Sequence, residues 1–330
     1  MTLDPQARVY LDKLDSLNLP GFHTMPPDEA RKLFRAMRGL AGKPDPIGSV
    51  RDEVVPDGIP IRIYRPLDAS EGPLPALLYF HGGGWVLGDL ETVDNLCRRL
   101  ANASGCVVVS VDYRLSPEHK FPEPLLDCWM ALAWLNLKAE EFGIDANRIA
   151  VGGDSAGGNL AAAVALKTRS VEADRTASNL SEDLAEGEIP ATSIRPIAFQ
   201  LLIYPITNHG FDTASYRENA EGYGLSRDMM GWYWNQYLAR SEDGQDPLAS
   251  PLLEPDLSRL PPALVITAGY DVLRDEGSAF AKRLQEAGVA VELRHFPGMI
   301  HGFLQMADSF DEGRLAIHAA GQALRRALRE

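Results

Sequence analysis

Cysteine and long apolar runs are both scarce in this chain of 330 residues. Its three cysteines, Cys97, Cys106 and Cys128, form no Cys-x-x-Cys pair, which argues against a disulfide framework and favours a reducing compartment. No apolar run approaches the roughly 18 residues that a membrane-spanning helix needs. The first residues also lack the basic and apolar regions of a signal peptide. We therefore expect a cytoplasmic protein with no membrane partner.

Basic charge is in deficit as well, since 32 Lys and Arg residues face 46 Asp and Glu residues, for a net charge of −14. An acidic surface repels phosphate backbones, so we expect no nucleic-acid partner. The sequence contains no His-Glu-x-x-His motif and no close pair of histidines, and we expect no metal ion. No lysine follows a glycine run in the Walker arrangement either. These absences disfavour nucleic-acid-binding proteins, metalloenzymes and P-loop proteins.

What the chain does have is an alternation of short apolar runs and helical stretches. Residues 52–64 predict a hairpin that turns at Asp57-Gly58. After it, near-continuous apolar runs between helical patterns indicate a mostly parallel sheet with helices on both faces. The sequence therefore predicts an α/β fold whose functional loops follow the carboxyl ends of the strands. The predicted strands are 76–80, 107–111, 149–151, 199–203, 264–268 and 289–296.

Three stretches interrupt this alternation. Two amphipathic helices, predicted at about 5–17 and 28–40, precede the first strand and form an N-terminal segment. Residues 170–195 are polar and acidic, and they predict an insertion in the core. A later stretch is rich in tyrosine and tryptophan and predicts a second covering segment. The expected division is 1–50 (N-terminal segment), 51–204 (core), 205–245 (second segment) and 246–330 (core).

The sequence Gly153-Asp154-Ser155-Ala156-Gly157 lies between a predicted strand and a predicted helix. A strand-to-helix turn this tight strains the residue at its tip and exposes the hydroxyl of Ser155. The same position places Ser155 at a helix N-terminus, where free N–H groups favour negative charge. This context predicts a serine nucleophile.

A second glycine-rich motif, His81-Gly82-Gly83-Gly84-Trp85, follows the strand at 76–80. Acyl transfer places negative charge on a carbonyl oxygen, and backbone N–H groups without side chains can approach that oxygen. We expect Gly83, Gly84 and Ala156 to be the donors of this oxyanion hole, with Gly82 as a further candidate. We expect His81 to brace the loop by hydrogen bonding and not to act as a base.

A serine nucleophile needs a general base and an acid that orients it. His301 directly follows the last predicted strand, whereas His295 lies within that strand pattern. Asp271 and Asp275 both follow the strand at 264–268; we select Asp271 because it comes first, and we expect Asp275 to cap the next helix. The chain order Ser155, Asp271, His301 is the order typical of α/β-hydrolases.

On these motifs the chain resembles the bacterial hormone-sensitive lipase-like carboxylesterases that carry Gly-Asp-Ser-Ala-Gly. The resemblance implies an α/β-hydrolase fold with a helical cap, formed by the N-terminal segment and the stretch after Pro205. It also implies hydrolysis of short-to-medium acyl esters without a cofactor, and a homodimer. Among the aromatic residues, we expect Trp85, Tyr204 and Trp232 to line the substrate pocket. The matching stretches are 81–85, 111–118, 152–159, 201–205 and 301–303.

Two other functions fit the same fold. An amidase or peptidase would use the same catalytic residues on a different leaving group. A non-catalytic small-molecule receptor of this family would lack the histidine base, which is present here as His301. Val272 departs from the proline that the family usually has at this position, which puts the geometry of that loop in question but not its chemistry.

Overall fold

The computed structural model describes residues 2–37, 43–69, 71–177 and 194–329, and these residues contain one sheet of eight strands. The order across the sheet is β1-β2-β4-β3-β5-β6-β7-β8. Strands β3 to β8 run parallel, and β2 is antiparallel to both of its neighbours. This confirms the predicted hairpin and the mostly parallel sheet. The strands are β1 (Ser49–Val55), β2 (Ile59–Arg65), β3 (Leu74–Phe80), β4 (Val107–Val111), β5 (Ile144–Asp154), β6 (Phe199–Ile203), β7 (Ala263–Tyr270) and β8 (Val291–Ile300).

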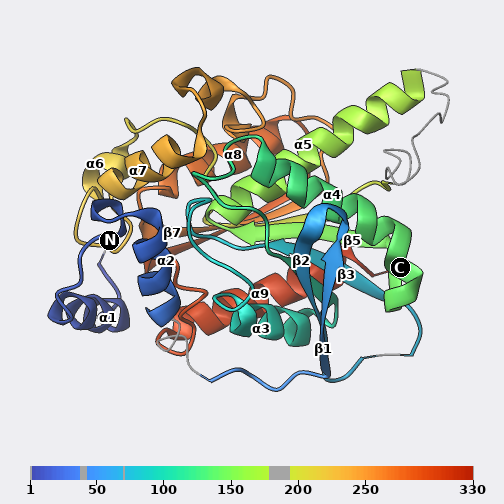
Figure 1. Cartoon of the computed structure of the whole chain (residues 1–330), viewed down its shortest axis with the longest axis horizontal. Helices are drawn as coiled ribbons and strands as arrows, with labels where there is room; N and C mark the ends of the chain where they lie inside the picture. The colour runs from blue at the N-terminus through green and yellow to red at the C-terminus, as the bar shows by residue number, and fades with distance from the viewer. Residues whose placement is uncertain (1, 38–42, 70, 178–193, 330) are drawn as a thin grey trace.

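Helices cover both faces of this sheet, as Figure 1 shows. Neighbouring residues of one strand supply opposite faces, because side chains alternate along a strand. In β3, Leu77 packs in a cluster with α3 and α9, whereas Leu78 packs in a cluster with α4, α5 and α8. The helices are α3 (Asp94–Ser104), α4 (Glu123–Lys138), α5 (Ala156–Ala177), α8 (Arg274–Glu286) and α9 (Asp311–Ala327).

The parallel strands end in register at one edge of the sheet. Phe80 of β3 lies opposite Gly153 of β5, and Asp154 lies opposite Ile203 of β6. Further along, Tyr270 of β7 pairs with Ile300 of β8. The segments that follow these strands therefore begin side by side, which is where open α/β sheets bind ligands.

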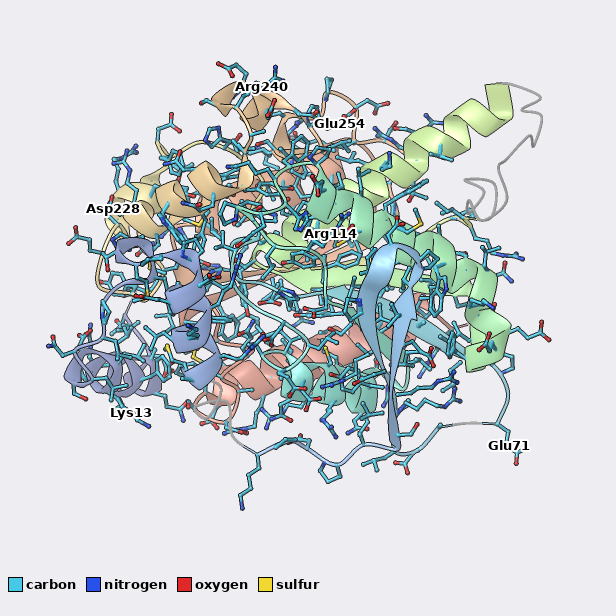
Figure 2. The ribbon with its side chains drawn as sticks, in the orientation of Figure 1. Lys13, Glu71, Arg114, Asp228, Arg240 and Glu254 are labelled. Atoms are coloured by element: carbon cyan, nitrogen blue, oxygen red, sulfur yellow. The ribbon has the colours of Figure 1, made fainter. Side chains whose placement is uncertain are left out.

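Four more helices gather beside that edge: α1 (Pro5–Ser16), α2 (Pro27–Ala36), α6 (Ala214–Glu218) and α7 (Arg227–Tyr237). In Figure 2, Lys13 of α1 and Asp228 of α7 lie at the outline of the molecule, and both are exposed. Tyr10 and Tyr233, on the same two helices, are buried. These helices thus present aromatic side chains inward and charged side chains to solvent.

The predicted insertion at 170–195 falls only in part on described residues. Helix α5 continues through Ala177, so the beginning of this stretch is helical. Residues 178–193 lie outside the described residues. Among the residues that the structure describes, no helix is long and apolar enough to cross a membrane.

Candidate active site

The turn between β5 and α5 places Ser155 in a left-handed conformation, with φ of +56°. This conformation is costly for a residue with a side chain, and the surroundings must enforce it. The N–H of Ser155 donates to the carbonyl of Ile203 (2.9 Å), and its carbonyl accepts from the N–H of Ile206 (3.2 Å). A Cβ on Gly157 would lie 1.8 Å from the carbonyl oxygen of Phe80. Only glycine fits there, so the neighbouring strand fixes the shape of the turn.

The structure brings Ser155, His301 and Asp271 into one hydrogen-bonded chain. His301 Nε2 lies 3.0 Å from Ser155 Oγ, and His301 Nδ1 lies 2.8 Å from Asp271 Oδ2. A carboxylate only accepts, so Nδ1 carries the proton and Nε2 is free to accept the serine proton. Asp271 is 1 % exposed, and its other oxygen accepts the N–H of Leu273 (2.9 Å).

The glycine loop, residues 81–85, follows β3 and adopts a conformation that needs glycine. Gly83 has φ of +115° and Gly84 has φ of +60°. Both residues line the same cavity as Ser155, and among the described residues neither N–H has an acceptor. Ala156 is the first residue of α5, where N–H groups have no partner within the helix. These three N–H groups can therefore bind a developing oxyanion.

His81 stabilises this loop through hydrogen bonds and ring stacking. Its Nδ1–H donates to the carbonyl of Gly82 (2.8 Å), while its own carbonyl accepts from the hydroxyl of Tyr113 (2.7 Å). The His81 and Tyr113 rings stack with centroids 4.3 Å apart. The ring is fully buried and is tied to the loop, not directed at Ser155.

Gly82 was wrongly expected among the oxyanion donors. Its N–H donates to Asp154 Oδ1 (3.0 Å) and is therefore not available to a substrate. The same carboxylate accepts the hydroxyl of Tyr79 (2.6 Å) and the side-chain amide of Gln305 (2.6 Å). Burial raises the pKa of Asp154, although these three donors oppose that effect. Asp154 thus connects the glycine loop to the segment that carries His301, and no sequence motif pointed to Gln305.

A cavity of about 220 Å³ lies against Ser155 and His301. Residues at the sheet edge and residues of the helices beside it form its wall, and most of their side chains are apolar or aromatic. The N-terminal segment contributes Tyr10, Leu14, Phe22, Phe34 and Met37. The stretch around α7 contributes Leu225, Met229 and Tyr233.

The three aromatic residues expected in this pocket do not line it. Trp85 is fully buried and stacks on Tyr237, with ring centroids 4.0 Å apart. Tyr204 is buried beneath the site, with its ring 4.6 Å from that of His301. Trp232 lines a separate surface hollow. Its neighbour Tyr233 points into the cavity instead, because successive residues of a helix point about 100° apart.

Comparisons with known proteins agree with this arrangement. A family model described as alpha/beta hydrolase fold matches residues 77–305, which carry the glycine loop and all three residues of the hydrogen-bonded chain. The chain belongs to this family, in its hormone-sensitive lipase-like branch of carboxylesterases.

The sequence matches to its relatives extend over nearly the whole chain. An arylesterase of Saccharolobus solfataricus is 37% identical over 308 residues, which are 92% of this chain and 93% of the relative. An ethyl acetate hydrolase of Pseudomonas putida is 36% identical over 99% of this chain and 100% of its own. A solved ester hydrolase from the metagenome of Lake Arreo, in complex with a bipyridine phosphonate derivative, is 41% identical. It superposes with a TM-score of 0.89 over 98% of this chain and 99% of its own. The enzyme is a carboxylesterase.

Proposed function

We propose that the enzyme hydrolyses short-to-medium acyl esters with Ser155 as nucleophile, His301 as general base and Asp271 as the orienting acid. The observation that carries this proposal is the hydrogen-bonded chain, with 3.0 Å from His301 to Ser155 and 2.8 Å from His301 to Asp271. These distances are within the range for proton transfer between a nucleophile and its base.

In the proposed mechanism, His301 removes the proton from Ser155 Oγ as that oxygen attacks the ester carbonyl. The N–H groups of Gly83, Gly84 and Ala156 stabilise the negative charge of the tetrahedral intermediate. Asp271 stabilises the imidazolium that forms. The imidazolium then protonates the leaving alcohol, and the acyl group stays on Ser155. Water, activated by His301 in the same way, releases the acid and regenerates the serine.

The cavity supports the substrate class in this proposal. It holds about 220 Å³ between the sheet edge and the covering helices, which suits a small apolar acyl group better than a long chain. Because both the N-terminal segment and the stretch around α7 contribute to its wall, we assign 1–50 and 205–245 as the two parts of a cap. In this assignment the cap sets which esters reach Ser155.

Replacing Ser155 by alanine tests the mechanism. We expect Ser155→Ala to reduce hydrolysis of p-nitrophenyl butyrate by at least about 10³-fold, because the attacking oxygen is lost. Ser170→Ala is the matched control, since Ser170 lies further along the same helix and its hydroxyl, among the described residues, bonds only to the carbonyl of Leu166. Circular dichroism checks that both variants fold. An active, folded Ser155→Ala enzyme would exclude Ser155 as the nucleophile.

We also propose that the enzyme forms a homodimer and is located in the cytoplasm. The sheet ends at β8, whose outer edge has no partner strand among the described residues, and Leu293 on this strand is exposed. An open edge of this kind can pair with a second copy. Size-exclusion chromatography with light scattering measures the mass in solution, and a monomer at micromolar concentration would contradict the dimer.

A further inference from the structure

The acid loop, residues 269–273, is bonded to a short helix of the covering segment. Helix α6 has five residues and lies on this loop and on the start of α8. Asn219, directly after α6, is 3 % exposed. Its side-chain amide donates to the carbonyl of Asp271 (3.1 Å) and to that of Gly269 (3.4 Å). Both acceptors belong to the acid loop, so one amide group binds Asp271 itself and the residue two positions before it.

Ser215 makes a second connection, from the other end of α6. Its hydroxyl donates to the carbonyl of Val272 (2.6 Å), the residue directly after Asp271. Its N–H donates to the carboxylate of Asp275 (2.7 Å). Asp275 was expected to cap the helix that follows it; instead it accepts from the covering segment, and α8 begins before it, at Arg274. An ion pair between Arg274 and Glu218 (2.9 Å) closes the contact on the solvent side.

These bonds are concentrated around one residue. The carbonyls of Gly269, Asp271 and Val272 all accept from α6 or from Asn219. Gly269 is still part of β7, but residues 271–273 follow the strand outside the sheet, so their position depends on these contacts as well as on the start of α8. The carboxylate of Asp271 must also stay within hydrogen-bond distance of His301, because displacements of about 1 Å in an active site can cost about 100-fold in rate.

We propose that Asn219 is a positioning residue for Asp271, with Ser215 as its second support, so that the covering segment helps to build the triad as well as the pocket. This inference rests on the proposed function, in which Asp271 orients His301. It assigns to α6 a role in the chemical step that does not involve contact with substrate. Asn219 acts through the backbone of the acid loop and touches no reacting atom.

Asn219→Leu tests this role, because leucine has a similar shape but donates no hydrogen bond and adds no charge. We expect kcat on p-nitrophenyl butyrate to fall by about 10- to 100-fold, with KM unchanged within about twofold, since the cavity wall is intact. Asn136→Leu is the matched control. Asn136 lies on α4 and does not line the catalytic cavity; its amide donates to the carbonyl of Leu132 (2.8 Å) and accepts the N–H of Arg195 (3.2 Å).

The pH profile separates positioning from a general loss of stability. A displaced Asp271 stabilises the imidazolium of His301 less, so the acid limb of the kcat/KM profile moves to lower pH, by about half a unit. The substitution leaves the titratable and charged groups around the loop in place, so the shift reports the position of Asp271. These groups are Asp154, Glu218, Arg274, Asp275 and Glu276.

Each result has a defined meaning. A lower kcat with a shifted acid limb supports the proposal, whereas an unchanged kcat, or a lower kcat with an unmoved limb, overturns it. Should Asn219→Leu fail to fold, Ser215→Ala removes a single hydroxyl and is judged by the same two criteria. Ser155→Ala is measured in parallel. If that variant stays active, the proposed mechanism fails; if it is inactive while the Asn219 and Ser215 variants match Asn136→Leu, only the positioning role fails.

Discussion

The loops at the sheet edge and the helices that cover them are held by different kinds of contact. In the loops, backbone atoms pack directly against the backbone of neighbouring segments. A Cβ on Gly157 would lie 1.8 Å from the carbonyl oxygen of Phe80, and a Cβ on Gly83 would lie 2.2 Å from the carbonyl oxygen of Leu87. In the cavity wall, side chains pack against other side chains. The ring of Phe22 packs edge-on against that of Phe34, with centroids 5.7 Å apart. Backbone contacts tolerate almost no change, whereas side-chain contacts can repack. We therefore expect the catalytic loops to tolerate little change and the choice of ester to be adjustable.

The acid loop departs from this division. Asn219 and Ser215 belong to the covering segment, yet they bind the backbone of the loop that carries Asp271. Polar contacts therefore join the covering segment directly to the loop that carries the orienting acid. Changes elsewhere in the covering helices should alter selectivity, and changes at this point should alter the rate.

A glycine-to-alanine exchange in each region gives the largest expected contrast. Gly157→Ala places a methyl group against Phe80, so we expect a loss of about 3 kcal/mol or more in stability and of most esterase activity. Gly231→Ala adds the same methyl group to helix α7, where, apart from the helix's own backbone and the two chain neighbours, no described residue comes within 4 Å of it. We expect this variant to gain about 0.5–1 kcal/mol in stability, because alanine favours the helix.

Chemical denaturation and p-nitrophenyl butyrate hydrolysis measure both effects. If Gly157→Ala kept the stability and the activity of the parent enzyme, the turn would be less constrained than the structure indicates, and the contrast between loops and covering helices would disappear.

The same division explains what could be predicted from sequence. Ser155, Asp271 and His301 were found because each follows a recognisable apolar strand, and the ends of parallel strands meet. The pocket residues were not found, because Trp85, Tyr204 and Trp232 are aromatic but face the core or another hollow. Aromatic composition does not reveal which side of a helix faces the cavity.

The other misses have the same physical origin. Gly82 stands in a run of three glycines, and nothing in the run shows that its N–H is taken by the carboxylate of Asp154. Asp275 accepts from Ser215, which lies 60 positions earlier, and Asn219 donates to Asp271, which lies 52 positions later. Side-chain contacts between distant segments leave no periodic signal, whereas strands, helices and tight turns do.

A substitution in the cavity wall should change selectivity by about tenfold. The ring of Tyr233 lies directly on Gly84, where an added Cβ would come 2.2 Å from Tyr233 Cδ1. We expect Tyr233→Ala to enlarge the cavity and to raise the kcat/KM ratio of p-nitrophenyl octanoate to butyrate by about tenfold, since each buried methylene is worth about 1–3 kcal/mol. Trp232→Ala, one residue away on the same helix, is the control. An equal change of this ratio in both variants would contradict the assignment of Tyr233 to the cavity wall.

The last expected effect concerns stability alone and lies at a junction of the two regions. Glu276 of α8 is 1 % exposed and accepts the N–H groups of Thr207 (2.6 Å) and Asn208 (3.2 Å), at the start of the covering segment. Burial raises the pKa of Glu276 from 4.5 to about 8, and Asp271 adds to this effect. Below pH 4.5 the carboxyl is protonated in both the folded and the unfolded chain. Between about pH 4.5 and 8 only the unfolded chain releases the proton, so stability falls as pH rises and the loss is complete above 8.

Glu276→Gln removes this dependence while it keeps an oxygen for the N–H of Thr207. We expect the melting temperature of the variant to rise relative to the parent enzyme by several degrees as pH increases from 5 to 9, because the raised pKa of Glu276 corresponds to several kcal/mol of stability. Glu286→Gln, an exposed change on the same helix, should leave the pH dependence unaltered. Parallel curves for the parent and Glu276→Gln would mean that Glu276 is ionised in the folded enzyme. The contact between α8 and residues 207–208 would then join the two regions through a charged group, as Arg274 and Glu218 do.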